Sequence, residues 1–118
     1  MTYVDGFLLV VPNKKLAAYA AIAKQAGKVW KELGALEYRE CAAEDMTAAF
    51  GIPFPKRVSA KKGETVVFSW ITYKSRAHRD RVNKKVMKDP RMLAMCGKQQ
   101  PFDLQRMSYG GFTVLVEM

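Results

Sequence analysis

Two helix-like stretches each lie between two strand-like runs, so the sequence reads as β-α-β twice. The expected strands are Thr2–Val11, Ala35–Cys41, Thr65–Tyr73 and Ser108–Val116, and the expected helices are Lys14–Leu33 and Arg76–Lys88. With right-handed crossovers, two such units form a four-stranded antiparallel sheet in spatial order 4-1-3-2. Both helices then cover one face. The sequence therefore predicts a β-α-β-β-α-β fold of the α+β class, as a single domain over residues 1–118.

The expected helix ends carry recognisable signals. Asn13 and Ser75 are residue types that cap helix starts, and Gly34 can take the left-handed conformation that closes a helix. Two long connections, Glu44–Glu64 and Asp89–Met107, follow the second expected strand and the second expected helix, and the latter connection contains a possible helical turn at Arg91–Met95. Loops of this length in a compact domain are uncommon and often functional.

The strand patterns predict a partner. The first and third strands are apolar on both sides, which suits central strands, whereas the second is more polar and suits an edge. Two helices can cover only one face, so the other would expose Phe, Val, Leu or Trp side chains. Large apolar patches are rare on monomers, and two-fold pairing would bury about 1,600 Å². We therefore expect a homodimer whose two sheets meet face to face across a two-fold axis.

The sequence composition indicates where in the cell the protein is expected. No apolar run approaches the about 20 residues that cross a bilayer, and Asp5 interrupts the first apolar segment, so neither a membrane span nor a signal peptide is expected. Cys41 and Cys96 match no close-spaced metal or redox pattern. We expect reduced thiols in a cytoplasmic protein.

The net charge of +9 points to an anionic partner or to a solvated surface. Residues Lys74–Arg91 contribute eight Lys or Arg and two Asp, a net +6. The candidate nucleic-acid contacts are Arg76, Arg79, Arg81, Lys84 and Lys85. No stacking aromatics are interleaved there, and Tyr109–Val114 only partly matches an RNA-recognition motif. The pattern favours a solvated helix face over RNA binding.

Two titratable residues are candidates for catalysis. His78, the only histidine, lies on the expected inward stripe of the second helix and titrates nearest neutral pH. Asp5 lies among apolar strand neighbours, where burial would raise its pKa. The structural alternatives are a hydrogen-bonded histidine, and a carboxylate paired with Arg39 or a backbone donor.

Three further residues are candidates for ligand binding. Tyr38 and Arg39 follow each other on the second strand, where they and the next residue, Glu40, could contribute to a pocket, and Trp70 could form the wall of an aromatic cavity. The alternatives are that the residues of the second strand are simply exposed on an edge strand, and that Trp70 packs in the core or at an interface. One His and two distant Cys form no zinc pattern, and no phosphate loop or nucleophile motif is present. We therefore expect neither a metal nor a cofactor.

Five segments spread over the whole chain resemble those of a known bacterial family. They are Tyr3–Phe7, Ala35–Cys41, Val66–Ile71, Tyr73–Val82 and Tyr109–Phe112. They are similar to segments of the YbaA-like family of unknown function. The resemblance implies a ferredoxin-like fold of the dimeric α+β-barrel superfamily and no established reaction. Other barrels of that superfamily include cofactor-free monooxygenases, heme-degrading enzymes, isomerase-like enzymes and stress proteins, among which fold kinship cannot choose.

Three hypotheses of function remain. The first is a dimer that binds or transforms a small organic molecule without a cofactor, by oxygenation or isomerisation. There, Asp5 or His78 would move the proton, and Trp70 and Tyr38 would shape the site. The second is a nucleic-acid binder that uses the basic helix. The third is a stress or assembly protein without catalysis, so whether the protein is an enzyme stays open.

Overall fold

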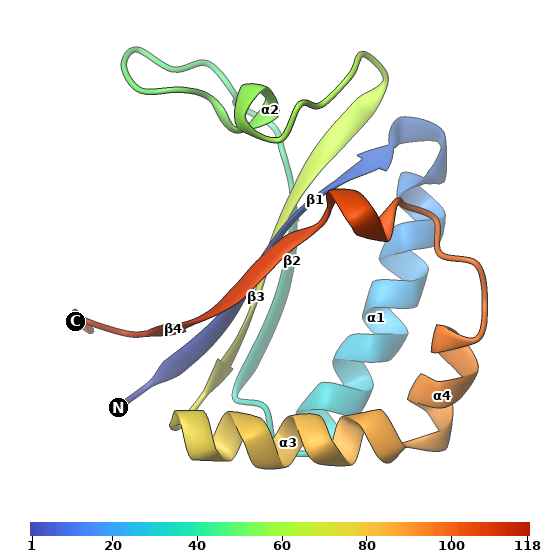
Figure 1. Ribbon diagram of the computed structural model, residues 1–118, viewed down its shortest axis with the longest axis vertical. Helices are drawn as coiled ribbons and strands as arrows, with labels where there is room; N and C mark the ends of the chain where they lie inside the picture. The colour runs from blue at the N-terminus through green and yellow to red at the C-terminus, as the bar shows by residue number, and fades with distance from the viewer.

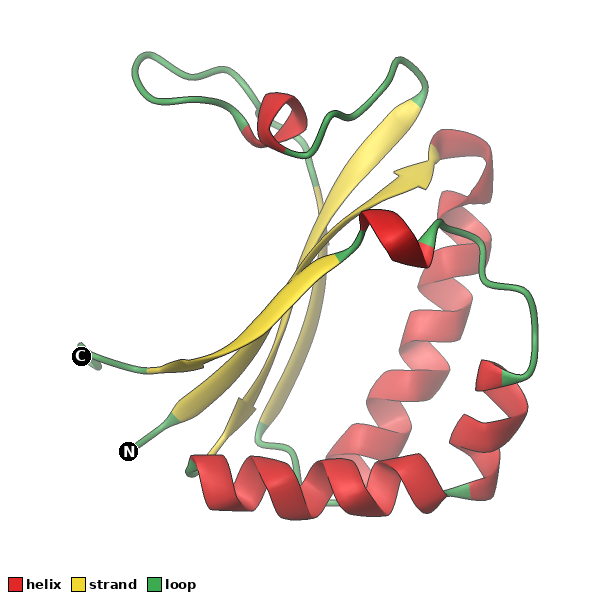
Figure 2. Cartoon of the chain, in the orientation of Figure 1, coloured by secondary structure: helices red, strands yellow, loops and turns green.

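The computed structural model describes all 118 residues, and its main elements follow the expected order. The strands are β1 (Tyr3–Pro12), β2 (Glu37–Ala42), β3 (Glu64–Tyr73) and β4 (Ser108–Thr113). The helices are α1 (Leu16–Glu32), α2 (Phe54–Arg57), α3 (Arg76–Lys88) and α4 (Pro90–Cys96), with 3-10 turns at Asn13–Lys15 and Leu104–Arg106. The antiparallel sheet has the order β2-β3-β1-β4, which confirms the predicted topology (Figure 1). Helices α1 and α3 lie on one side of it (Figure 2).

The start of α1 differs from the prediction, whereas its end agrees with it. Asn13 does not cap the helix, because it lies in a 3-10 turn and its side-chain oxygen accepts a hydrogen bond from the Thr65 hydroxyl on β3. At the other end, Gly34 has a φ of +122°. The amide of Ala35 donates back to the carbonyl of Trp30 at 2.9 Å, so the chain turns at the glycine and enters β2.

Helix α3 has the predicted bounds. The Ser75 hydroxyl accepts a hydrogen bond from the amide of His78 at 3.1 Å, which confirms the predicted cap. Beyond α3, the Asp89 side chain caps α4, which begins at Pro90 because proline tolerates the first helical position. No helix of the fold has the length and apolar character that a membrane crossing requires.

The strand register decides which side chains meet the helices. Leu9 pairs with Val67, and Tyr38 pairs with Ile71. Since successive strand residues point to opposite faces, odd-numbered residues of β1 and β3 and even-numbered residues of β2 face α1 and α3. The core on this side contains Leu9, Val11, Val29, Val67, Ile71, Tyr73, Val82 and Val86.

The opposite side, here called the open face, has an apolar part formed by Val4, Leu8, Phe68, Trp70 and Phe112, and Glu37 and Arg39 of the edge strand β2 lie on the same side. Phe68 is 45% exposed and Phe112 is 62% exposed. The loop that carries α2 projects on this side at one end of the sheet (Figure 1), where the Phe54 ring lies 6.2 Å from that of Phe68. The rest of the open face has no covering element.

The chain also departs from the expected strand ends. β4 stops at Thr113, three residues before the predicted Val116, because only the amide of Val114 continues the pairing, to the carbonyl of Thr2 at 3.0 Å. Leu115 beyond it is exposed. The paired glycines that open β4 form no bulge. A side chain at Gly111 would overlap the Tyr3 ring, so the glycine admits a close neighbour.

Candidate functional site

A cavity lies between α1 and the helix-facing side of the sheet. Its volume is about 210 Å³, and 11 of its 14 lining residues are hydrophobic. The sheet contributes its floor and α1 its roof. The segment between α4 and β4 closes one side. Representative lining residues are Phe7, Ile22, Ala26, Trp30, Ile71 and Phe102.

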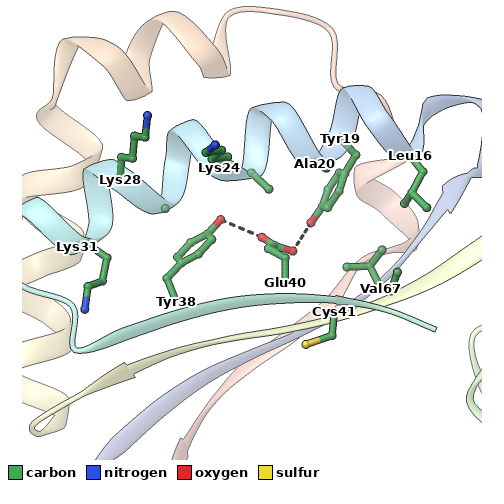
Figure 3. A pocket seen from close by; sticks show the side chains of 13 residues that line it. Leu16, Tyr19, Ala20, Lys24, Lys28, Lys31, Tyr38, Glu40, Cys41 and Val67 are labelled. Atoms are coloured by element: carbon green, nitrogen blue, oxygen red, sulfur yellow. Dashed lines mark hydrogen bonds between the residues drawn. The ribbon is translucent and has the colours of Figure 1, made fainter. Parts of the chain in front are cut away.

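A groove of about 700 Å³ adjoins this cavity along the gap between α1 and the edge strand β2. Lys24, Lys28 and Lys31 of α1 line it (Figure 3). The Lys31 ammonium donates to the carbonyl of Leu36 at 2.7 Å. Four residues line both spaces, namely Tyr19, Ala23, Tyr38 and Glu40. The groove therefore offers an approach to the cavity.

Glu40 stands at this boundary, where its carboxylate joins helix and strand. Its Oε1 accepts from the Tyr19 hydroxyl at 2.7 Å, and its Oε2 accepts from the Tyr38 hydroxyl at 2.8 Å (Figure 3). Burial, and then the negative charge of Glu40, raises the pKa of both tyrosines. Both phenols therefore stay protonated as donors. No ion pair of the fold includes Glu40.

A glycine lets Tyr38 reach this position. A Cβ atom at Gly27 of α1 would lie 2.8 Å from Cδ1 of the Tyr38 ring. The Trp30 ring lies 6.0 Å from that of Tyr38 on its other side. The missing side chain thus allows the tyrosine to lie directly under the helix.

Ser69 supplies a second polar group on the floor of the cavity. It is 4% exposed and lies opposite Glu40 on β2 and Phe7 on β1. Its hydroxyl takes part in none of the side-chain hydrogen bonds of the structure. It is therefore available to a molecule in the cavity.

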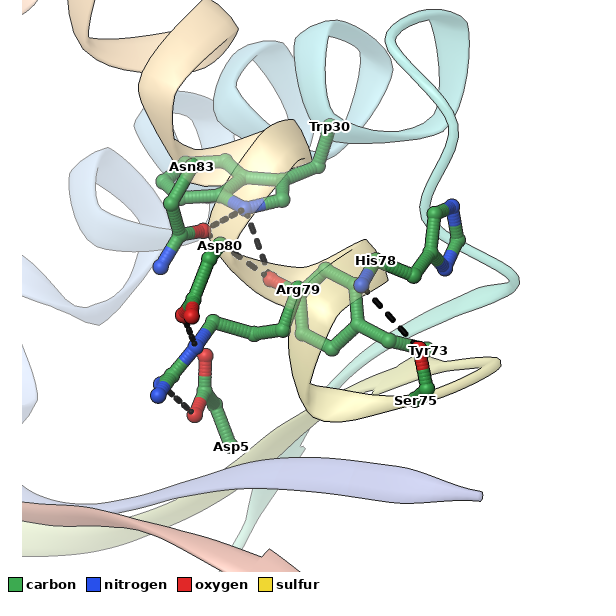
Figure 4. A network of polar contacts seen from close by, with 8 residues as sticks. All are labelled: Asp5, Trp30, Tyr73, Ser75, His78, Arg79, Asp80 and Asn83. Atoms are coloured by element: carbon green, nitrogen blue, oxygen red, sulfur yellow. Dashed lines mark hydrogen bonds and ion pairs between the residues drawn. The ribbon is translucent and has the colours of Figure 1, made fainter. Parts of the chain in front are cut away.

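Asp5 pairs with a different arginine from the one expected. Its Oδ1 accepts from Arg79 of α3 at 2.6 Å, and Arg79 Nε also donates to Asp80 at 2.8 Å (Figure 4). The predicted pairing with Arg39 is wrong, because Arg39 pairs instead with Glu37 on the edge strand at 3.4 Å. Burial raises the pKa of Asp5 despite the opposing charge of Arg79.

A neutral network lies next to this ion pair. Trp30 Nε1 donates to the Tyr73 hydroxyl at 3.1 Å and to Asn83 Oδ1 at 3.3 Å, and the Tyr73 hydroxyl donates to Asn83 at 3.2 Å (Figure 4). These contacts join α1, β3 and α3. The network holds the end of α1 that forms part of the cavity roof.

His78 lies away from the cavity. Its Nδ1 accepts from the amide of Lys74 at 3.0 Å, and its ring meets that of Tyr73 edge-on at 5.9 Å. Desolvation, and then the charges of Lys74 and Arg81, lowers the pKa of His78. Neither His78 nor Asp5 lines the cavity or the groove. Their catalytic roles stay predictions.

The three candidate ligand-binding residues do not converge. Tyr38 and Arg39 border the cavity, but Trp70 lies on the open face, where its Nε1 donates to Glu37 at 2.8 Å. Within the basic helix, Arg79 is engaged by the Asp5 carboxylate. Four candidate nucleic-acid contacts remain at the surface: Arg76, Arg81, Lys84 and Lys85. Their role stays a prediction.

Sequence reasoning missed Tyr19 and Ser69, and it named Glu40 only as a possible pocket residue beside Tyr38 and Arg39. Signals for the first two exist. Tyr19 falls on the apolar stripe of α1, and Ser69 is the polar member of the alternating set with Val67 and Ile71. No group of three or more His, Cys, Asp or Glu side chains is arranged to hold a metal ion.

Sequence comparison identifies relatives along the whole chain. A family model described as "Protein of unknown function (DUF1428)" matches residues 2–104. The "Uncharacterized protein YbaA" of Escherichia coli strain K12 is 45% identical over 117 residues, which are 99% of both chains. The protein of that name from Shigella flexneri matches equally. The chain therefore belongs to the DUF1428 family, and the resemblance to YbaA-like proteins is confirmed.

Solved structures share the fold at low sequence identity. Rv0793 of Mycobacterium tuberculosis has a TM-score of 0.57 at 14% identity, covering 99% of this chain and 98% of that one. An uncharacterized NIPSNAP domain protein of Burkholderia xenovorans has a TM-score of 0.56 at 14% identity, covering 95% and 93%. A Nitrosomonas europaea protein, named provisionally as an antibiotic biosynthesis monooxygenase, has a TM-score of 0.58 at 11% identity, covering 97% and 90%. These likenesses confirm the ferredoxin-like α+β fold.

Proposed function

We propose that this member of the DUF1428 family binds a small organic molecule in the cavity between α1 and the sheet. The observation that carries the proposal is the Glu40 carboxylate, which two tyrosine hydroxyls hold at the cavity boundary without a cation. Ligand sites combine apolar walls with a few placed polar groups. A carboxylate with one donor on each oxygen still has acceptor positions for a ligand.

The volume of the cavity sets the size of that molecule. Pockets for drug-sized ligands hold roughly 300–1,000 Å³, whereas an engineered apolar cavity of about 150 Å³ in another protein binds benzene. The cavity here, at about 210 Å³, lies between these cases. It suits a single ring with one or two substituents.

For chemistry in this cavity, we assign proton abstraction to Glu40 in place of Asp5 or His78. Glu40 is the carboxylate among the lining residues, and neither of the other two borders the space. Oxygenation or isomerisation without a cofactor would need such a base. The provisional name of the Nitrosomonas europaea protein supports the idea of oxygenation on this fold, and at 11% identity it supports no more.

We further propose a homodimer that meets through the open face. This face forms a hollow of about 660 Å³ whose lining contains no charged residue, although the protein carries a net +9. A second copy offers the same uncharged apolar surface across a two-fold axis. Pairing would remove Phe68, Trp70 and Phe112 from water, which is the favourable term in association.

We place this dimer in the cytoplasm. Cys41 and Cys96 are both free in the structure. Exposed free thiols suit a reducing compartment. Labelling both thiols in freshly lysed cells tests this assignment, since oxidised cysteines would contradict it.

A thermal-shift screen of fragment-sized compounds tests the binding proposal. A compound at about a hundred times its Kd should raise the melting temperature by several degrees. Ala26→Phe fills the cavity, and Ala21→Phe adds the same bulk on the exposed side of α1. Hits should persist in Ala21→Phe and vanish in Ala26→Phe, with circular dichroism confirming that both variants fold. Hits that survive Ala26→Phe, or a screen without hits, would contradict the proposal.

A further inference from the structure

One hydroxyl group that lines the cavity makes no hydrogen bond to another side chain. Ser69 is 4% exposed and lies on the helix-facing side of β3 between Val67 and Ile71. The fold leaves its hydroxyl out of every side-chain hydrogen bond, although it lines the cavity. No buried side-chain nitrogen or oxygen of the structure lacks a hydrogen-bond partner, so the unbonded Ser69 oxygen is accessible from the cavity. A ligand in the cavity can therefore form a hydrogen bond with it.

A carboxylate that does not bond to Ser69 lies beside this donor. Glu40 is the cross-strand partner of Ser69, and directly opposed residues have Cβ atoms about 5 Å apart. Even so, the Glu40 carboxylate bonds to the hydroxyls of Tyr19 and Tyr38 and not to Ser69. The floor of the cavity therefore offers one free hydroxyl donor next to a carboxylate acceptor. A ligand hydroxyl can satisfy both, since it accepts one hydrogen bond and donates another.

Electrostatics selects against charged ligands. A carboxylate or phosphate on the ligand would meet the negative charge of Glu40 at short range, whereas the guanidinium of Arg39, which also borders the cavity, is paired with Glu37. A cation would have to pass the groove lined by Lys24, Lys28 and Lys31. A neutral group avoids both costs.

The aromatic residues that line the cavity favour a particular body for the ligand. Phe7, Tyr19, Trp30 and Phe102 all border it, and the Tyr19 and Phe102 rings already meet edge-on at 5.5 Å. Aromatic rings prefer such edge-on or offset contacts with further rings. An aromatic ring is therefore the body that this lining fits.

We infer that the cavity binds a neutral single-ring phenol, whose hydroxyl donates to Glu40 and accepts from Ser69. This inference rests on the proposed function, since it names the ligand class of the same cavity. It adds Ser69 as a binding residue.

Calorimetric titration with four matched probes tests the inference. Phenol carries the hydroxyl, toluene replaces it with a methyl group, benzylamine is a cation and benzoate is an anion. Phenol should bind about tenfold or more tighter than toluene, because a hydrogen bond to a charged group is worth this much. It should also bind tighter than both charged probes.

Variants then assign the contacts. Ser69→Ala and Glu40→Gln should each bring the affinity for phenol close to that for toluene, with toluene binding unchanged. Ser108→Ala is the matched control, because Ser108 is an exposed serine on β4 that does not line the cavity. It should leave the phenol preference intact.

The results separate two kinds of failure. Toluene, benzylamine or benzoate binding as tightly as phenol would overturn the phenol inference, and so would an unchanged preference in Ser69→Ala. If no probe binds while screening hits still vanish in Ala26→Phe, the inference fails and the proposed cavity stands. If no compound of any kind binds to the wild type and loses this binding in Ala26→Phe, the proposed function itself fails.

Discussion

Asp5 and Arg79 lie 74 positions apart, and a guanidinium nitrogen of Arg79 donates to the Asp5 carboxylate at 2.6 Å. This ion pair joins α3 to the central strand β1. Asp5 is 6% exposed, so water cannot replace the arginine. The Arg79 guanidinium also lies over the Tyr3 ring, 5.0 Å from its centroid. The contact positions the helix and lies outside the cavity.

Arg79→Ala should therefore destabilise the protein. Removing one partner of a buried pair leaves an uncompensated charge and typically costs about 3 kcal/mol or more. Urea unfolding measures the change. Arg81→Ala, an exposed arginine on the same helix, should shift the free energy of unfolding by less than about 0.5 kcal/mol. Equal stability of the two variants would show that the pair does not hold α3 in place.

Glu64 should govern part of the acid stability. Two nitrogens of Arg106 donate to the Glu64 carboxylate at 2.7 and 2.9 Å, and the Lys61 amide donates to it at 2.7 Å. These hydrogen bonds lower the pKa of Glu64 from 4.5 to about 2. A depressed carboxyl pKa stabilises the fold above the unfolded-state pKa, and this contribution is lost as the pH falls towards 2. Wild type should exceed Glu64→Gln in stability at pH 6, with the advantage shrinking below about pH 4.5.

Thermal melts between pH 2.5 and pH 6 measure this effect. Glu44→Gln serves as the control, because Glu44 is exposed and takes part in no ion pair. Its melting curve should follow wild type throughout. If the stability difference between wild type and Glu64→Gln stayed constant with pH, the Glu64 carboxylate would not be the source of the acid sensitivity.

Gly27→Ala should reverse the usual effect of this substitution in a helix. Alanine normally favours a helix over glycine by about 1 kcal/mol. Here the added methyl group would meet the Tyr38 ring at 2.8 Å, and displacing the ring should cost about 1–3 kcal/mol. The variant should also lose cavity ligands, because Tyr38 holds Glu40. Gly97→Ala, where a Cβ meets only ordinary contacts from 3.6 Å, should be neutral in unfolding experiments.

Phe112→Asp should separate the proposed dimer. Phe112 is exposed on the open face, and a carboxylate there would face its own copy across the two-fold axis. Light scattering should give twice 13.3 kDa for wild type and 13.3 kDa for the variant. Leu93→Asp places the same charge on exposed α4 and should leave the dimer intact. A monomeric wild type at micromolar concentration would rule the dimer out.

The fold could be predicted where local signals and topology agree. Apolar side chains on both sides of β1 and β3 identified the central strands, and Ser75 marked the start of α3 correctly. Asn13 has the same capping chemistry but bonds to Thr65, a contact that no local pattern reveals. Strand-like residues continue to Val116, yet β4 ends at Thr113 because β1 begins at Tyr3 and offers no further partner.

The site was less predictable because its members meet only in three dimensions. Tyr38 was identified as a ligand-binding candidate, but Tyr19 reaches Glu40 from another element, 21 positions away. Alternation could have marked Ser69 as a polar residue in an apolar set. Nothing local distinguishes Arg79 from Arg39 as the partner of Asp5, since only the packing of α3 against β1 decides it.

The pairing of β1 with β4 has a consequence during synthesis. Tyr3 lies opposite Thr113, so the central strand gains its second neighbour only after nearly the whole chain has left the ribosome. Contacts between such distant segments slow folding, because the intervening loop must close first. A nascent chain should therefore expose one unpaired edge of β1 to chaperones until its last strand emerges.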